Sequence, residues 1–157
     1  ERDLEIPCKW PDASPFSEGL AAVANDSGRY GYIDNYGQCA IPFRWAYAYP
    51  FFEGFAGVED NGGFCYFIDN KGKEAFPSRW NRVDFFSEGF AGVLNGDKWG
   101  FVDKTGKLVV PCKWDEVDWF HHGKAKVWDD HHNVFLIDTQ GNIVASGEEA
   151  DSYDEGV

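Results

Sequence analysis

The amino-acid sequence predicts an all-β protein built from four repeats of about 35 residues. A glycine recurs at a nearly constant spacing of 35, 35 and 34 residues, at Gly19, Gly54, Gly89 and Gly123. After each glycine, apolar and small residues alternate with a period of two, which is typical of a β-strand. A turn rich in Asn, Asp and Gly then leads to a second apolar segment, and this order is typical of a β-hairpin.

The first strand of each hairpin follows the recurrent glycine. Its segments read LAAVAN, FAGVED, FAGVLN and KAKVWD, so the second residue is always Ala and the fourth always Val. The alternation places these residues on one inward face: Ala21, Val23, Ala56, Val58, Ala91, Val93, Ala125 and Val127.

The second strand reads YGYID, CYFID, WGFVD and VFLID, and it is apolar on both faces. One unit of 35 residues cannot cover both faces of its own hairpin, so the pattern predicts units that stack on one another. Each second strand ends in Asp-x-x-Gly, at Asp34, Asp69, Asp103 and Asp138. This motif suits a tight turn, because the Asp side chain bonds the backbone and Gly accepts a positive φ. We favour turn chemistry over a calcium loop, since the dense run of acidic ligands and the distal Glu are missing.

A short third strand leads to a recurrent Pro and, three residues later, to Trp10, Trp45, Trp80 or Trp114. We interpret these tryptophans as core residues rather than as a ladder for stacking sugars, because a fixed repeat position suits packing between units. The domain then spans residues 1–144, with repeats at about 6–40, 41–75, 76–109 and 110–144. Four antiparallel β-hairpin repeats stacked in a solenoid-like or superhelical array are expected. A small closed propeller is the alternative, although about 35 residues is short for a four-stranded blade.

Residues 145–157 are expected to form a flexible tail. The last ten residues carry five acidic side chains and no basic one, a composition typical of disorder.

The third repeat carries a combination of motifs that identifies a family. It contains Trp99-Gly100, a Phe-Val-Asp ending at Asp103, Gly106 and Val110-Pro111, and a Phe-Ser-Glu-Gly-Phe-Ala stretch precedes them. These residues resemble the WG repeat family, also called WG-containing or KWG repeat. Only the third repeat keeps the namesake dipeptide, since the others have Tyr-Gly, Cys-Tyr and Val-Phe there. The resemblance implies a bacterial-type β-repeat array that serves as an interaction platform and brings no catalytic residues.

The charge of the chain limits its partners. With 27 acidic and 14 basic residues, the formal net charge is −13, which repels nucleic-acid backbones and anionic lipid headgroups. No apolar run reaches the length of about 18 residues needed to span a bilayer. We expect a soluble protein, cytoplasmic rather than secreted, that binds neither nucleic acid nor membranes. The chain lacks Met and starts inside a repeat, so a fragment of a larger bacterial protein is expected.

Catalytic and metal motifs are not found in the sequence, so we expect neither an enzyme nor a cofactor. The glutamates Glu18, Glu53 and Glu88 recur with the repeat, which favours a turn role over paired acid–base catalysis. The four histidines lie at opposite ends of one predicted strand, too far apart for one metal ion. Four cysteines without a C-x-x-C pair are expected to be thiols, the alternative being a local disulfide such as Cys8 with Cys39.

Candidate binding residues lie in the last repeat. Lys124, Lys126 and Trp128 occupy its outward positions, and two lysines there favour a water-facing cap of the array. Trp128 and Trp119 are candidates for partner contact, because Trp is enriched at interface hot spots. The predicted function is protein–protein interaction or scaffolding, and the alternative is binding of carbohydrate or cell-surface glycan through these exposed aromatics.

Overall fold

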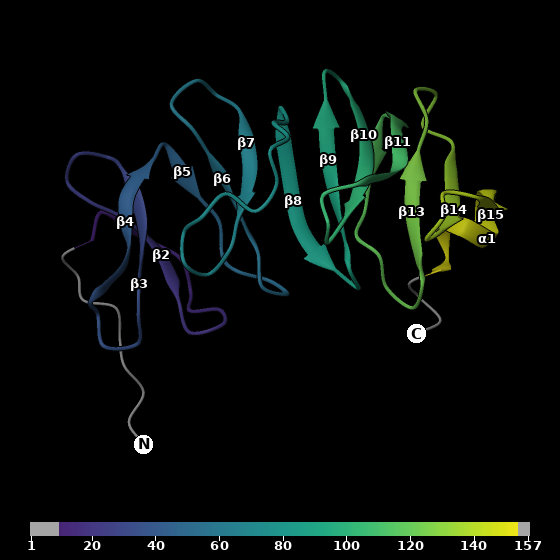
Figure 1. Cartoon of the computed structure of the whole chain (residues 1–157). Helices are drawn as coiled ribbons and strands as arrows, with labels where there is room; N and C mark the ends of the chain where they lie inside the picture. Colours follow the sequence, from purple (N-terminus) through teal and green to yellow (C-terminus); the bar gives the residue numbers. More distant parts are fainter. Residues whose placement is uncertain (1–9, 154–157) are drawn as a thin grey trace. The chain divides into compact units, whose positions relative to one another are not determined.

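The computed structural model of the 157-residue chain describes residues 10–153. The chain divides into two compact units, Glu1–Arg79 and Trp80–Val157. Each unit contains two antiparallel sheets, and each sheet corresponds to one repeat (Figure 1).

The first unit contains a four-stranded sheet followed by a three-stranded one. The first sheet has the order β1 (Asp12–Ala13), β2 (Ala21–Ala24), β3 (Tyr30–Ile33) and β4 (Cys39–Trp45). The second has the order β5 (Tyr47–Ala48), β6 (Ala56–Glu59) and β7 (Cys65–Ile68). A single bridge between Ile68 and Glu74 stands where the other sheets have a fourth strand.

The second unit contains two four-stranded sheets and a short helix. Its first sheet consists of β8 (Arg82–Ser87), β9 (Phe90–Asn95), β10 (Lys98–Asp103) and β11 (Leu108–Trp114). Its second sheet consists of β12 (Glu116–Val117), β13 (Lys124–Trp128), β14 (Val134–Asp138) and β15 (Ile143–Ser146), and helix α1 (Gly147–Asp151) follows.

The all-β repeat fold predicted from the sequence is confirmed, with one correction. The segment after each recurrent tryptophan pairs with the first hairpin strand, which adds a strand to every sheet. Three of these added strands are only two residues long. A repeat of about 35 residues, expected to be short for four strands, can therefore hold four, because a strand of two residues is enough to extend a sheet.

The predicted inward face of the first hairpin strand is confirmed. All eight alternating Ala and Val side chains are at most 1% exposed. In β2 the residues between them are buried as well, so this strand is covered on both faces.

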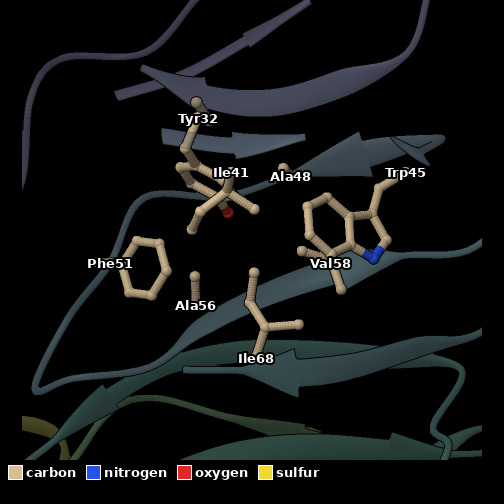
Figure 2. Packing of buried hydrophobic residues seen from close by; sticks show 9 residues of the cluster. Tyr32, Ile41, Trp45, Ala48, Phe51, Ala56, Val58 and Ile68 are labelled. Atoms are coloured by element: carbon tan, nitrogen blue, oxygen red, sulfur yellow. The ribbon is translucent and has the colours of Figure 1, made fainter. Parts of the chain in front are cut away.

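The second hairpin strand is buried on both faces, as its composition predicted. In β3, neighbouring side chains Tyr32 and Ile33 are both fully buried, but they belong to different clusters. Tyr32 packs with residues of the second sheet, among them Phe51 and Val58 (Figure 2). Ile33 packs on the opposite face, where Trp10 contributes. The two sheets of this unit thus share one core, because neither can cover its own hairpin alone.

The recurrent tryptophans are core residues in two repeats. Trp45 and Trp114 are buried within the clusters that join the two sheets of each unit. Trp10 is half-buried and stacks on Phe43 with ring centroids 5.4 Å apart. Trp80 is also half-buried, so full burial does not extend to all four positions.

The Asp-x-x-Gly turns form as predicted. The Oδ1 atom of Asp138 accepts the backbone N–H groups of Gln140 and Asn142, at 2.9 Å each, and the same pair of bonds forms at Asp34, Asp69 and Asp103. The glycine of each motif has a φ between 78° and 86°.

The recurrent glutamates take part in turns, as predicted. Glu18, Glu53 and Glu88 have φ values of 53° to 55°, in the left-handed region. The carboxylate of Glu18 accepts the Gly54 N–H at 3.0 Å, and that of Glu88 accepts the His122 and Gly123 N–H groups at 2.7 and 2.9 Å. In each unit, a glutamate of one repeat therefore holds the equivalent turn of the next.

The expected flexible tail was wrong for residues up to 153. β15 extends to Ser146, and α1 packs on β14 and β15 with Ala150 fully buried. The Tyr153 hydroxyl donates to the carbonyl oxygens of His121 and His122, at 2.9 and 3.2 Å. Composition suggested disorder, but the last sheet offers an apolar face that this segment covers. The remaining residues, 154–157, lie outside the described range.

Cys39, Cys65 and Cys112 are thiols, as expected. Cys8 lies outside the described residues, so the alternative pairing with Cys39 stays a hypothesis. No helix among residues 10–153 is long and apolar enough to cross a membrane.

Candidate functional site

The two candidate lysines are not an open surface. Both lie on β13 and face the C-terminal segment. Lys126 has a side chain that is only 13% exposed, and its Nζ hydrogen-bonds to the Asp151 carbonyl oxygen. Lys124 places its Nζ 6.0 Å from the centre of the Tyr153 ring. The expected water-facing cap was wrong at these positions, because α1 and Tyr153 fold back over them.

The two candidate tryptophans differ in exposure. Trp128 is half-buried at the end of β13, opposite Glu116 on one neighbouring strand and Val134 on the other. Trp119 follows β12 and is 47% exposed. Its ring lies on Phe85, with centroids 5.3 Å apart and an interplanar angle of 41°. Of the four predicted residues, Trp119 is the one that presents a large apolar group to solvent.

An aspartate precedes each aromatic of this pair. Asp84 accepts the Phe85 N–H on Oδ1 at 2.8 Å, and Asp118 accepts the Trp119 N–H on Oδ1 at 2.9 Å. These residues hold equivalent positions in the third and fourth repeats, 34 residues apart. We call Asp84, Phe85, Asp118 and Trp119 the acid–aromatic patch.

The surroundings of Asp84 in this patch disfavour its ionised form. Burial raises the pKa of Asp84, and the negative charge of Asp118 raises this pKa further, against the lowering effect of the Phe85 N–H. Within residues 10–153, neither aspartate forms an ion pair with a lysine, arginine or histidine. Over the described residues, the patch thus combines negative charge that has no ion-pair partner with an exposed Trp119 ring packed on a half-buried Phe85.

A second aromatic surface lies in the first unit and was missed from the sequence. Tyr47 and Tyr49 are exposed on and just after β5, and their ring centroids are 4.8 Å apart. Tyr30 extends the group, with its ring 4.6 Å from that of Tyr47. The period-two spacing of Tyr47 and Tyr49 could have revealed an aromatic face, but the segment was not recognised as a strand. We call Tyr30, Tyr47 and Tyr49 the tyrosine cluster.

One hydroxyl group of the tyrosine cluster, that of Tyr30, is hydrogen-bonded to a carboxylate. Tyr30 donates from its hydroxyl to Asp12 Oδ2 at 2.6 Å. Burial, followed by this bond to a carboxylate, raises the pKa of Tyr30 to about 12. The phenol therefore stays protonated at neutral pH, as a donor.

Histidine side chains of the last repeat contact residues next to them in the sequence. His121 and His122 approach each other with Nδ1 atoms 3.2 Å apart, and His131 lies 3.6 Å from an Asp130 carboxylate oxygen. Over the described range, no three His, Cys, Asp or Glu side chains gather in an arrangement that could hold a metal ion.

Comparison with solved structures supports the fold. BamB from Moraxella catarrhalis aligns over 88% of this chain and 48% of its own, with a TM-score of 0.55 at 12% identity. The computationally designed Ika8 protein gives a TM-score of 0.57 at 9% identity, over 87% of this chain and 49% of its own. The designed Ika4 protein gives 0.59 at 13% identity, over 88% and 98%. The chain thus spans about half the length of the first two, and at these identities the likeness concerns fold alone.

Comparison of sequences gives the family. No curated protein matches the sequence. The profile of the WG containing repeat matches four consecutive segments, residues 3–27, 30–64, 67–99 and 99–127. These segments cover most of the chain, and their bounds are offset from those of the sheets, since residues 30–64 contain β3 to β6. The chain therefore belongs to the WG containing repeat family.

Proposed function

We propose that this repeat module is non-catalytic and binds a protein partner through the acid–aromatic patch. The observation that carries the proposal is the exposed Trp119 ring held against Phe85. An exposed tryptophan with a fixed ring offers a large contact area at a low cost in conformational entropy, and Trp is enriched among interface hot spots. The roles of the recurrent Asp and Glu side chains in turns leave the repeats as a scaffold for such a surface.

Affinity capture tests the proposal with a matched pair of variants. The full chain, immobilised, is compared with Trp119→Ala and Tyr36→Ala in an extract of the source organism, with bound proteins quantified by mass spectrometry. Tyr36 is 82% exposed, and only its backbone N–H is tied to the Asp34 turn, so Tyr36→Ala removes an exposed aromatic elsewhere. We expect Trp119→Ala to lose captured proteins that the control keeps. Identical captured sets for the two variants would refute a role for this patch.

The tyrosine cluster favours carbohydrate binding as a second candidate function. Stacked aromatic rings offer a surface for the apolar faces of sugars, and Tyr47 lies opposite Glu59 on β6, whose carboxylate can accept sugar hydroxyl groups. A glycan array followed by titration of the intrinsic fluorescence tests this candidate. We expect a saturable response to a saccharide that Tyr47→Ala abolishes. The absence of any saccharide response removes it.

A further inference from the structure

The acid–aromatic patch holds two carboxylates whose charges are not neutralised by the chain. Asp118 lies close enough to Asp84 for its charge to act on that carboxyl. Each carboxylate accepts one backbone N–H on Oδ1, and across residues 10–153 neither one has a hydrogen bond on Oδ2. Asp84 and Asp118 are both half-buried, and two like charges that act on each other in such surroundings raise the free energy of the isolated protein.

Some acidic residues of the chain are paired with its own cations. Asp115 contacts Lys98 Nζ at 2.8 Å, and Glu74 contacts Arg79 Nη2 at 2.6 Å. Asp84 and Asp118 differ from these two residues, because across residues 10–153 neither forms an ion pair and the charge of Asp118 acts on Asp84. Charge complementarity indicates that the occupant of this surface is a cation.

The two aromatic rings favour a guanidinium group over a metal ion as the cation bound at this surface. A calcium ion takes six to eight oxygen ligands, whereas this surface offers two carboxylates next to two rings. A guanidinium group is planar, bonds carboxylates through two parallel N–H groups and stacks on aromatic faces. The ring of Trp119, 47% exposed beside Asp118, offers such a face. Of the cations in proteins, arginine fits both halves of the patch.

We propose that the acid–aromatic patch binds an arginine side chain of the partner, with the guanidinium between Asp84 and Asp118 and against Trp119. This inference rests on the proposed function, since it names the partner chemistry recognised by the same surface. The net charge of −13 also attracts basic segments and raises their rate of encounter.

A peptide titration followed by NMR tests the inference. The probe is acetyl-Gly-Gly-Arg-Gly-Gly-amide, added to the ¹⁵N-labelled full chain up to millimolar concentration. Matched peptides carry lysine, or citrulline, which has the shape of arginine without its charge. We expect saturable shifts of the Phe85 and Trp119 amides and of the Trp119 indole N–H, with affinity in the order arginine, lysine, citrulline.

Isosteric variants separate the patch from general attraction. Asp84→Asn and Asp118→Asn keep the Oδ1 acceptor of the turn and remove one charge each, so their spectra should stay close to that of the parent chain. We expect each to weaken arginine binding about fivefold, and Trp119→Ala to weaken it about threefold. Asp26→Asn, at an exposed position in the first unit, is the control for loss of one charge. It should change the affinity by less than twofold.

Three outcomes overturn the inference. The first is the absence of saturable chemical-shift changes at the patch. The second is a loss of peptide affinity in Asp26→Asn as large as that in Asp84→Asn or Asp118→Asn. The third is the same chemical-shift changes on addition of calcium chloride in place of the peptide. If Trp119→Ala abolishes partner capture while the arginine peptide does not bind, the arginine assignment fails and the proposed function stands. If the peptide binds at the patch but capture is unchanged in Trp119→Ala, the proposed function fails.

Discussion

The indole N–H of Trp45 has an acceptor, whereas that of its equivalent Trp114 has none among residues 10–153. Trp45 Nε1 donates to the Tyr66 hydroxyl at 2.8 Å. The equivalent of Tyr66 in the last repeat is Phe135, 21 residues after Trp114. Its ring lies 5.6 Å from that of Trp114, and Trp114 Nε1 is buried without a hydrogen-bond partner. The surroundings of Trp45 and Trp114 thus differ by the hydroxyl oxygen of Tyr66, which Phe135 lacks.

Replacing Tyr66 by Phe and Phe135 by Tyr should change the free energy of unfolding in opposite directions. Tyr66→Phe leaves a buried N–H without an acceptor and should lower the free energy of unfolding by about 1–2 kcal/mol. Phe135→Tyr supplies an acceptor for Trp114 and should raise it by about 1 kcal/mol. Urea denaturation followed by tryptophan fluorescence measures both. A neutral or destabilising effect of Phe135→Tyr would contradict this account.

The glycine of the Trp-Gly dipeptide is required by close contact with the backbone. A Cβ on Gly100 would lie 2.3 Å from the Val110 carbonyl oxygen, and one on Gly31 would lie 2.7 Å from the Ile41 carbonyl oxygen. In both sheets the register of the next strand shifts at this point, ahead of a proline. The other two repeats carry Tyr66 and Phe135 here and lack a seven-residue third strand. The departures from Trp-Gly therefore follow the geometry of each sheet.

Gly100→Ala should be strongly destabilising. The added methyl group meets backbone atoms that cannot move without breaking the β10–β11 pairing, so we expect a loss of about 3 kcal/mol. Gly62→Ala is the control, since its Cβ would approach no atom closer than 3.4 Å, and its stability should change by less than about 0.5 kcal/mol. Thermal and urea unfolding measure both variants, and equal midpoints for the two would disprove the steric explanation.

At the scale of elements, neighbouring repeats are joined by side chains of their turns. Ser87 Oγ donates to the Phe120 carbonyl oxygen at 2.8 Å, and Ser17 Oγ donates to that of Phe51. Together with the glutamates beside them, these serines tie a turn of one repeat to a turn of the next. In the repeat of β12 to β15, the Tyr153 hydroxyl donates to the His121 and His122 carbonyl oxygens of the equivalent turn.

Loss of the Tyr153 hydroxyl should weaken the last sheet. Tyr153→Phe removes the one O–H donor that two carbonyl oxygens share but keeps the ring, so we expect a loss of about 1 kcal/mol. Tyr36→Phe, at a position 82% exposed, is the matched control and should be neutral. Hydrogen exchange of the β14 and β15 amides should accelerate in Tyr153→Phe alone. Unchanged exchange would indicate that packing of α1 suffices without the hydroxyl.

The aspartate turns should make stability fall in acid. The backbone N–H of Asn142 lowers the pKa of Asp138 below its usual value of 3.8, against the effect of burial. Because the folded state binds the proton less readily, the ionised turn stabilises the fold above this value, and its contribution is lost as the pH falls through the lower folded pKa.

Asp138→Asn isolates this contribution. Asn keeps the Oδ1 acceptor but carries no charge, so the variant should be less stable than the parent at neutral pH. The difference between the two should shrink as the pH falls from about 5 to 2. Urea midpoints across this range measure the effect, and a difference independent of pH would refute it.

At the scale of the whole molecule, self-repulsion is the dominant electrostatic effect. The net charge is −13 and the isoelectric point about 4.5. Repulsion between the acidic side chains destabilises the compact state and is screened by salt.

Salt should therefore stabilise the protein. We expect the melting temperature at pH 7 to rise by about 3 °C when sodium chloride is increased from about 10 mM to 0.5 M. Sodium and potassium chloride should act alike if screening is the cause. A fall in melting temperature would show that attractive ion pairs outweigh the repulsion.

The sequence by itself determined the repeat, the hairpins and the turns. The inward Ala and Val residues and the Asp-x-x-Gly turns were predictable because the interactions that define them lie within a few residues of the chain. A period of two decides which side chains of a strand share a face, and an Asp side chain reaches only the next few N–H groups. The composition of the second strand also showed that both of its faces must be covered.

Only the tertiary structure decided the edge strands, the docking of the C-terminal segment and the candidate surface. A strand of two residues is too short to be recognised from its own sequence, so β5 was not predicted and the spacing of Tyr47 and Tyr49 was not interpreted as a shared face. The lysines of β13 were expected in solvent because nothing local indicates that α1 returns to cover them. Trp119 was identified as a candidate, but its contact with Phe85 and the nearby Asp84 depends on two repeats lying side by side. Such contacts join residues 34 positions apart, and their geometry is set by how the sheets pack rather than by any local pattern.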